Sequence, residues 1–517
     1  MKKTLALILA LVMLFSMSTG SFAQSDAPLA DKVRVAISSD VVTLDPLGDN
    51  AQGKHMVMPC FAEWLCILTE VGGELQPCIA KSWEQVDDYH IRATIYDYVY
   101  DTAGNHITAS DVAYSYNKCI EKGMMAASLN MIDDVVAIDD YTVEFTVNTT
   151  AAGTLINTLT GCPIVSQAAY EADPEGMANN PICTGPYVVT EFIPGSTVKV
   201  KRSGNYWQTP ELTCAYSQAN VEEIEFNVVL EAAQLSMMLE TGEVDIAGYL
   251  QENEVANFDG LDGYTTTSTT NCLSMVLLFN CDSSNVFANK ALRQAVCYAI
   301  DNEAILQNVF GGKGSVNKSY GNDVYGDFVD KWYDEDYYDY DMEAAKAKLA
   351  EAGYEPGELH VKIMTTTESH FIRIGELVQA FLSTIGISSE IVSYESSLYN
   401  SYRFAPEEWD LRVDNKGAGD YITSVYKYSF DQDMFGGQTQ NFYVDEEMQQ
   451  LLETAMDEKT HTPENIDAVH QAIKESAIGY GLCSNMINYV SNDSKVKKIV
   501  YNWFQKAVIG ACEFVTE

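Results

Sequence analysis

Apolar and polar residues alternate with a period of two in several short stretches of the chain, which predicts β-strands. Residues 33–37 form one such stretch near the amino terminus. Two more are separated by a Pro-Gly pair: residues 187–192 are rich in β-branched and aromatic types, and residues 197–201 place Val198 and Val200 on one face. A Pro-Gly turn between two extended runs predicts a β-hairpin.

Elsewhere apolar residues recur at helical spacing. Thr108 and Asp111 together form a helix-start signal, and Val112, Tyr116 and Ile120 follow on one predicted face. We expect this helix to pack against a core through that face.

Four further segments carry signals of the same kinds. Residues 221–247 predict a strand, a helix and a glycine-marked turn into another strand, and residues 409–413 predict a strand. Residues 289–301 and 341–354 each predict an amphipathic helix, the second of which stops at Gly353. Because strands and helices alternate throughout, the chain is predicted to have an α/β fold.

The amino terminus has the pattern of a cleavable signal peptide over residues 1–23. Lys2 and Lys3 precede an apolar run over residues 5–15, and Ser-Phe-Ala at residues 21–23 forms a small-residue cleavage site. The apolar run is shorter than the ~20 residues that a bilayer span needs. No cysteine stands near the cleavage site, so the lipobox of lipid-anchored exported proteins is absent. We expect a soluble protein outside the cytoplasm, in the periplasm or the cell envelope.

Length and charge limit the further possibilities. Cleavage of 23 residues from 517 leaves 494, enough for two or three domains. The net charge of −43 becomes −45 when Lys2 and Lys3 are removed. Such a chain lacks the basic surface that nucleic acid or an anionic membrane requires as a partner. The charge does not show that the ligand is a cation, because a solvated acidic surface is the commoner explanation.

The sequence contains no catalytic or metal-binding pattern with local support. The sequence contains no GxSxG, HExxH or GxxxxGK[ST], and its seven histidines show no ligand spacing. Residues 311–314 lack the Walker spacing, and the acidic run at residues 333–341 lacks the glycine and closing glutamate of an EF-hand loop. We therefore expect no enzyme activity, no cofactor and no metal ion.

The twelve cysteines form no CxxC pair and none has a histidine at zinc-ligand spacing. In an oxidising compartment some of them could form disulfides, whereas in a reducing one they could remain as small buried apolar side chains. The sequence leaves both possibilities open.

Residues 180–207 (NPICTGPYVVTEFIPGSTVKVKRSGNYW) resemble the signature NPxGTGPY … PG … RNPxYW of family 5 solute-binding proteins, which serve peptide and nickel ABC importers. Cys183 stands where that signature has a glycine. Further segments resemble the same family, in the family's order: residues 43–46, 75–84, 98–116, 221–247, 289–301 and 341–354. The resemblance covers nearly the whole chain after the predicted signal peptide.

This resemblance implies a two-lobed fold of the periplasmic binding protein type (type II, cluster C), with an extra subdomain and a hinge of two crossing segments. Lobe I would be discontinuous, formed by residues 31–50, 181–280 and 486–517. The inserted subdomain would span residues 51–180, and lobe II would span residues 281–485. Two crossing segments suit hinge closure around a ligand.

The function that the resemblance implies is capture of short peptides between the lobes and their delivery to the permease of an ABC importer. The protein would act as a monomer and would catalyse nothing. An alternative is a non-peptide solute on the same fold, such as a nickel chelate, an oligosaccharide or another small nutrient. A secreted hydrolase is a remote alternative, because no nucleophile or metal constellation supports it.

Residues 416–421 (KGAGDY) resemble the ligand-binding segment GWxADYxDP of the family. By this resemblance Asp420 grips the α-ammonium of a peptide, with Tyr421 beside it. Gly417 stands in place of a tryptophan, and Thr423 and Ser424 stand where Asp-Pro would follow. We therefore expect a wider or differently shaped pocket.

Three further residues are candidates for ligand contact. His370, at a predicted junction between a strand and a helix, resembles a ligand-facing position of the oligopeptide-binding branch. Arg412 and Lys416 are the cations nearest to the KGAGDY segment, and either could meet a ligand carboxylate.

Overall fold

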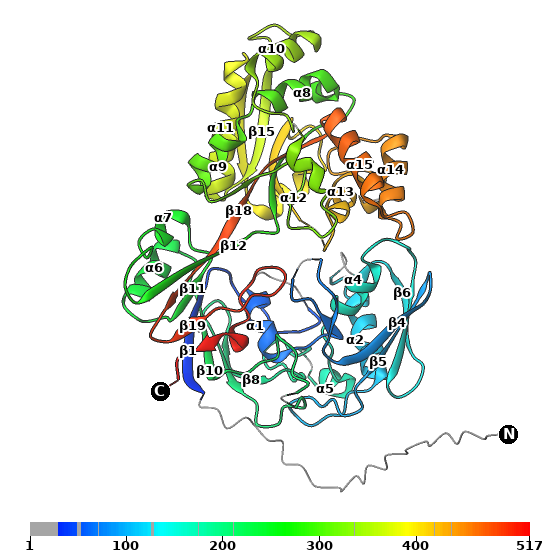
Figure 1. Cartoon of the computed structure of the whole chain (residues 1–517), viewed down its shortest axis with the longest axis vertical. Coiled ribbons are helices and arrows are strands. Elements are labelled where there is room, and N and C mark those ends of the chain that lie inside the picture. Colours follow the sequence, from blue (N-terminus) through cyan, green and yellow to red (C-terminus); the bar gives the residue numbers. More distant parts are fainter. Residues whose placement is uncertain are drawn as a thin grey trace, which may run out of the picture.

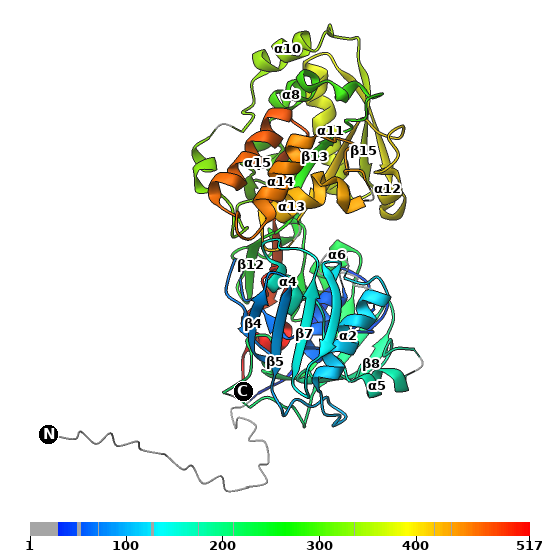
Figure 2. The ribbon, with the colours of Figure 1, turned by 90° about the vertical axis from the view of Figure 1, so that its right-hand side faces the viewer.

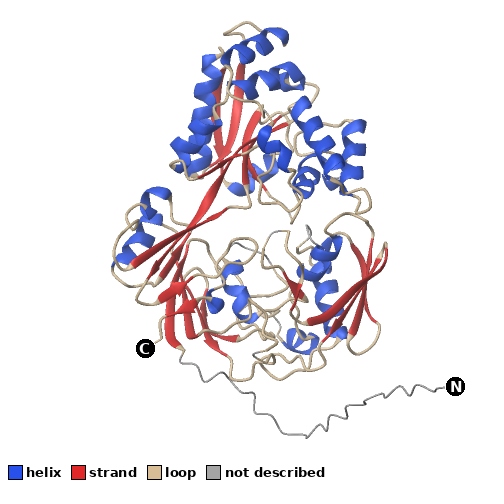
Figure 3. Ribbon diagram, viewed as in Figure 1, coloured by secondary structure: helices blue, strands red, loops and turns tan. Residues whose placement is uncertain are grey.

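The computed structural model describes residues 29–48, 53–70, 72–125, 129–173, 175–209, 211–335, 337–417, 419–435 and 437–516. The predicted signal peptide lies outside these residues. Strands and helices form two lobes, one above the other in Figure 1, and the carboxyl terminus lies in the lower lobe. Figure 3 shows that each lobe mixes strands with helices, which confirms the α/β prediction.

The lower lobe contains a mixed sheet in the order β11-β1-β10-β9-β8. β1 is parallel to both of its neighbours, whereas β10, β9 and β8 are successively antiparallel. The bounds are Ala30–Ile37 for β1, Tyr187–Ile193 for β8, Thr197–Arg202 for β9, Val221–Val228 for β10 and Ile246–Gly248 for β11. The hairpin predicted around the Pro-Gly turn is confirmed, with Gly195 at φ +71° in that turn and Val198 and Val200 buried.

A separate antiparallel sheet, in the order β4-β5-β7-β6, forms the other side of the lower lobe, where Figure 2 shows its face. The bounds are Ala80–Asp87 for β4, His90–Ile95 for β5, Ile132–Ala137 for β6 and Thr142–Val147 for β7. Helix α2 (Ala109–Glu121) packs on this sheet and begins at the predicted helix start, where Thr108 and Asp111 form a capping box. Val112 and Tyr116 are buried as predicted, but Ile120 is 37% exposed, and Cys119 is buried in its place.

Shorter elements complete the lower lobe. They are α1 (Lys54–Phe61), β2 (Cys66–Ile67), β3 (Gln76–Pro77), α4 (Thr154–Thr160), α5 (Gln167–Ala172), α6 (Ala232–Glu240), α7 (Glu252–Val255), β19 (Val496–Lys498), η4 (Ile509–Ala511) and β20 (Glu513–Phe514).

The upper lobe is built on a second mixed sheet in the order β16-β15-β17-β13. Its strands are β13 (Ser274–Phe279), β15 (His360–Thr366), β16 (Ser388–Tyr394) and β17 (Leu411–Lys416). β15 is parallel to β16 and β17, and β13 is antiparallel to β17. The strand predicted at residues 409–413 is therefore confirmed in type and lies two to three residues further along the chain.

Helices surround this sheet, α8 and α11 among them (Figure 1). The elements are η1 (Val286–Ala288), α8 (Lys290–Ala299), α9 (Asn302–Phe310), β14 (Gly314–Val316), η2 (Asp330–Asp334), α10 (Met342–Glu351), α11 (Ser369–Thr384), α12 (Ser396–Tyr402), α13 (Ile422–Phe430), η3 (Gln432–Phe435), α14 (Glu446–Met456) and α15 (Pro463–Ser476). The predicted helices α8 and α10 are confirmed. Asn289 and Asp341 cap them through side-chain oxygens.

Two segments carry the chain between the lobes. β12 (Tyr264–Thr270) lies below, and residues 271–273 lead from it up to β13. β18 (Gly479–Asn492) belongs to both lobes, because its first half pairs with β13 and β14 and its second half with β11 and β12 (Figure 1). These are the two crossing segments that the fold class predicted.

The lobes have separate hydrophobic cores. One cluster joins side chains of β1, α1, α2 and the four-stranded sheet, and others join side chains of the upper-lobe sheet to α8, α11, α13 and α15. The predicted domain boundaries stay a proposal. β13, which the boundary at residue 280 assigns to lobe I, pairs with β17 of the upper lobe. Of the helices in the described residues, none is both long and apolar enough to cross a membrane.

All twelve cysteines lie in the described residues and carry free thiols in this structure. Cys281 is partly exposed and the other eleven are buried. They fill space in the two cores as small apolar groups.

Candidate ligand-binding cleft

A cleft of about 750 Å3 lies between the two lobes and is lined by residues of both. Its lower wall comes from α1, α4 and the segment 502–506. Its upper wall comes from the end of β17, the exposed face of α13 and residues that follow α12. A volume of this size lies in the range of about 300–1,000 Å3 that is typical of small-molecule sites.

Much of the cleft lining is apolar. The apolar residues come from segments that are far apart in the sequence. Five methionines and several aromatic side chains contribute to it. Representative members are Met58, Met131, Met434, Trp64, Tyr428 and Trp503. Methionine side chains are flexible and polarisable, so such walls adapt to apolar parts of different ligands.

The upper wall holds a buried cluster of charges around Asp414. Arg412 and Lys416 both donate to the Asp414 carboxylate, and Lys416 Nζ also donates to Gln440 Oε1 at 2.8 Å. Burial alone would raise the pKa of Asp414, but the charges of Lys416 and Arg412 outweigh it and hold that pKa below its usual value. Burial lowers the pKa of Lys416 to about 8.

A second pair of charges lies near Cys272, in the crossing segment between β12 and β13. The Asp420 side chain is buried, and its Oδ1 atom has no hydrogen-bond partner among the described residues. Burial raises the pKa of Asp420 to about 7 and lowers that of Lys506 to about 8. Burial raises the pKa of the Cys272 thiol to about 11. The charge of Asp420 also raises this pKa, whereas the charge of Lys506 lowers it. Both groups thus lie close enough to Cys272 to act on its thiol, and of the two only Lys506 lines the cleft.

The structure places the predicted site residues at three kinds of position. Lys416 and Gly417 line the cleft. Asp420 is buried next to the lining residue Gly419. Like Asp420, Arg412 and His370 lie outside the lining, but their side chains have partners within the protein, so we do not assign them to the ligand.

The positions of Arg412 and His370 have clear physical causes. Arg412 is fully buried behind the upper wall, where it donates to Asp414 and to the carbonyl of Gln440 at 3.0 Å. His370 is at the start of α11, as predicted, but its ring packs against Phe310 and Phe371. Burial in this environment lowers the pKa of His370.

Gly417, which replaces a tryptophan of the family segment, has close neighbours on the side where a side chain would lie. A Cβ atom at Gly417 would lie 2.7 Å from Leu273 Cδ2, 2.9 Å from the Tyr325 hydroxyl and 3.0 Å from the Cys272 carbonyl oxygen. The space is therefore filled by the crossing segment and by Tyr325. A side chain at position 417 would therefore overlap these neighbours in this structure.

Tyr421 lies where the two lobes touch. Its ring lies within 3.0 Å of the position that a Cβ atom of Gly153 would occupy, and it packs edge-on against His461. Close by, the backbone nitrogen of Ala152 donates to the Met456 carbonyl at 2.6 Å, and that of Glu458 donates to the Thr150 carbonyl at 2.8 Å. We call residues 150–153, 421 and 456–458 the lobe contact.

The signature at residues 180–207 positions the lower wall. A Cβ atom at Gly185 would lie 2.5 Å from the backbone carbon of Phe61, the last residue of α1. Tyr206 and Trp207 donate to the carboxylate of Glu63 at 2.6 and 2.7 Å. The signature therefore fixes the end of α1, a helix that lines the cleft, and does not itself contact the ligand space.

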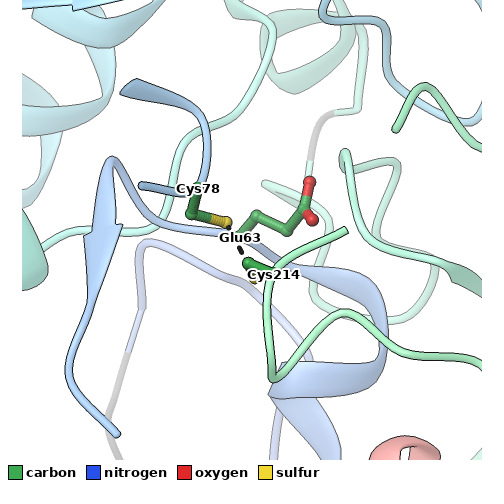
Figure 4. Close-up of side chains that lie close together, drawn as sticks. All are labelled: Glu63, Cys78 and Cys214. Atoms are coloured by element: carbon green, nitrogen blue, oxygen red, sulfur yellow. Dashed lines mark hydrogen bonds between the residues drawn. The ribbon is translucent and has the colours of Figure 1, made fainter. Parts of the chain in front are cut away.

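Glu63 also belongs to the one group of potential metal ligands found among the described residues, together with Cys78 and Cys214 (Figure 4). The two sulfur atoms are 3.5 Å apart. Besides Tyr206 and Trp207, Gln208 and Ser217 donate to Glu63, so its carboxylate accepts four hydrogen bonds. A carboxylate has about four lone-pair positions, and here the protein already uses them. The group therefore serves to join segments of the lower lobe.

Sequence reasoning missed three cations that line the cleft: Arg403, Lys427 and Lys506. They come from the turn after α12, from α13 and from the segment near the carboxyl terminus. No motif or spacing relates them, so only the fold identifies them. Taken together, the arrangement suits non-covalent binding of a charged ligand with apolar parts.

Comparisons with known proteins agree with this geometry. A curated relative, heme-binding protein A of Haemophilus influenzae, is 24% identical over 371 residues, which cover 65% of this chain and 65% of the relative. The dipeptide-binding protein of Escherichia coli is 24% identical over 359 residues, covering 63% of this chain and 64% of the relative. The chain thus spans just under two thirds of the length of these relatives.

Among solved structures, the dipeptide-binding protein of Pseudoalteromonas sp. SM9913 in complex with Met-Leu superposes with a TM-score of 0.78. The two sequences are 19% identical, and the match covers 94% of this chain and 100% of the other. This confirms the predicted two-lobed fold. The sequence model of the bacterial extracellular solute-binding proteins, family 5, matches residues 74–440. The chain therefore belongs to the family 5 extracellular solute-binding proteins of bacteria.

Proposed function

We propose that this protein captures short peptides between its two lobes and delivers them to the permease of an ABC importer. Members of family 5 bind a solute and do not transform it. Peptide capture is supported by the inter-lobe cleft of about 750 Å3 and by relatives that are named as peptide-binding proteins. The chain would work as a monomer in the periplasm or cell envelope, exported by the signal peptide at residues 1–23.

The observation that carries the proposal is the unpaired carboxylate of Asp420. A buried carboxylate without a partner is costly, and its pKa rises for that reason. A peptide α-ammonium beside Oδ1 would satisfy it and would restore the ionised form. Charge-assisted hydrogen bonds of this kind contribute about 1.5–3 kcal/mol. We therefore assign Asp420 to the amino end of the ligand.

The test is an Asp420→Ala variant titrated with the tripeptide Ala-Ala-Ala in a calorimeter. We expect the variant to bind about 2–5 kcal/mol more weakly, because the ligand ammonium would be buried without its partner. N-acetyl-Ala-Ala-Ala is the control ligand, since it lacks the ammonium. Wild type and variant should bind this control peptide equally poorly. Unchanged affinity for the unmodified tripeptide would end the assignment.

A non-peptide solute is the second candidate. The methionine and aromatic side chains in the lining favour it, because they suit a ligand with large apolar parts. The first relative described above is named for binding heme, which is not a peptide. Native mass spectrometry of protein purified from its own host distinguishes the candidates: a co-purified mass that peptide sequencing cannot explain would favour the non-peptide solute.

A further inference from the structure

The charge of the cleft has the opposite sign to the charge of the molecule. The whole chain carries 31 lysines and arginines against 74 aspartates and glutamates. Of its described residues, however, those that line the cleft include four such cations, Arg403, Lys416, Lys427 and Lys506, and a single acid, Asp414. Positive charge is therefore concentrated at the position where a ligand would lie.

The one lining carboxylate is already used. Asp414 accepts from both Arg412 and Lys416, and Arg403 lies close enough to lower the pKa of Lys416 further. Two cations thus share this single buried carboxylate, and Arg403 lies nearby without pairing to it. Because buried charges are stable only when they are paired, this wall has an excess of positive charge for an anion to balance.

Two of the lining cations, which have no ion-pair partner within the described ranges of the chain, indicate where that anion would bind. The Nε atom of Arg403 is buried and has no hydrogen-bond partner among the described residues, while its guanidinium lies over the rings of Phe404 and Phe435. Lys427 is half-buried on α13, next to the lining residue Tyr428. In the part of the chain that the structure describes, neither side chain forms an ion pair.

Lys506 provides a further cation away from this cluster, in the carboxyl-terminal segment of the lower lobe. It is half-buried beside the lining residues Trp503 and Phe504 and pairs with no described carboxylate. A neutral peptide has one terminal carboxylate, which could balance the positive charge of only one of these two groups of cations. Lys506 on one lobe and Arg403 with Lys427 on the other suit a ligand with two negative groups.

We propose that the cleft selects peptides of net negative charge, with an acidic side chain bound by Arg403 and Lys427 on the upper wall. This inference rests on the proposed function, because it specifies which peptides are captured. Lys506 meets the second negative group, the terminal carboxylate.

The experiment compares three tripeptides by calorimetry at pH 7 and low salt: Ala-Glu-Ala, Ala-Gln-Ala and Ala-Lys-Ala. The first two have nearly the same shape and differ by one negative charge. We expect Ala-Glu-Ala to bind at least about ten-fold more tightly than Ala-Gln-Ala, and Ala-Lys-Ala to bind most weakly. Added salt should reduce the preference, because it screens the charges.

Variants Arg403→Gln and Lys427→Gln test the assigned positions. Each variant should bring the ratio between the affinities for Ala-Glu-Ala and Ala-Gln-Ala several-fold closer to one. This ratio separates a lost charge contact from general damage to the fold. Lys346→Gln is the matched control, because Lys346 is 52% exposed on α10 and outside the cleft, and its ratio should equal that of the wild type.

Equal affinity of the wild type for the glutamate and glutamine peptides would overturn this inference and leave peptide capture in place. An unchanged ratio in both cleft variants would also overturn it. Failure of all three tripeptides to bind would refute both this inference and the proposed function.

Discussion

At the scale of single residues, the cleft is marked by charges that the protein itself does not neutralise. Asp420 is 2% exposed and Lys506 is half-buried, and burial moves the pKa values of both towards neutrality. Folding thus pays a desolvation penalty that a complementary ligand removes. Side chains arranged for stability alone would be paired or exposed.

Replacement of Asp420 by asparagine should make the protein more stable at pH 8 and leave its stability nearly unchanged at pH 4. The folded-state pKa of about 7 lies above the ordinary value of 3.8. Between these values the unfolded chain has lost a proton that the folded chain keeps, so wild-type stability falls as the pH rises and levels off above pH 7. The asparagine variant does not titrate at this position, so its free energy of unfolding does not fall in this way. The difference at pH 8 amounts to at most about 4 kcal/mol.

Denaturant unfolding of the Asp420→Asn variant and the wild type at several pH values measures this difference. Asp262→Asn, at an exposed position, is the control and should follow the wild type. A variant that is no more stable than the wild type at pH 8 would contradict the buried, unpaired state of Asp420.

At the scale of elements, the family signature acts by holding α1 against the hairpin of β8 and β9. Gly185 allows the close approach of the Phe61 backbone, and its own nitrogen donates to the Phe61 carbonyl at 2.9 Å. Tyr206 and Trp207 then anchor Glu63 two residues beyond the helix. The most informative sequence segment is therefore a structural device that aligns the lower wall of the cleft.

A Gly185→Ala substitution should lower the free energy of unfolding by about 1–3 kcal/mol, because the added methyl group would overlap the backbone of Phe61. Gly204→Ala is a matched control within the same signature, since nothing lies within 4 Å of a Cβ atom there. Denaturant unfolding compares the two variants. Equal stabilities would show that the Phe61 backbone moves to accommodate the added methyl group without loss of stability.

At the scale of the whole molecule, the lobes are joined by the two crossing segments and also meet at the lobe contact. Figure 1 shows β12 and β18 on the left and α4, which follows Gly153, on the right. The lobes therefore touch on the side of the cleft away from the crossing segments. Contacts on this side would be broken whenever the lobes open to admit or release a ligand.

Gly153→Ala should weaken peptide binding several-fold by disfavouring the lobe contact. The alanine methyl would lie 2.8 Å from the Tyr421 ring, at a backbone φ of +82°. If the contacted arrangement is the one that binds, its lower population reduces the apparent affinity in proportion.

Gly104→Ala separates the two effects of that substitution. Gly104 has φ +89° in the same lobe but nothing within 4 Å of a Cβ atom, so its variant suffers the backbone strain alone. Both variants should lose about 1–2 kcal/mol of stability, and only Gly153→Ala should lose affinity. Calorimetry with the tripeptide that the wild type binds best checks this. Equal affinities in the two variants would exclude a role of the lobe contact in binding.

Local sequence signals were sufficient to predict many elements of the fold. The hairpin at Gly195, the helix start at Thr108 and the helices α8 and α10 all lie where they were predicted. Each depends on neighbours within a few residues in the chain, so the sequence is enough to identify it. Ile120 is an exception, because it has the predicted helical spacing but is exposed. Spacing alone does not show where the buried face of a helix ends.

The amino-acid sequence was thus enough to establish the family, the α/β class and the segment that contains Asp420. Tertiary structure alone decided that Arg403, Lys427 and Lys506 line the same cleft, that Leu273 and Tyr325 fill the space at Gly417, and that Arg412 is buried with Asp414. The physical reason is that burial, pairing and pKa depend on neighbours that are brought together across the two lobes. The number of residues between two positions in the sequence does not show whether they will be in contact across the lobes.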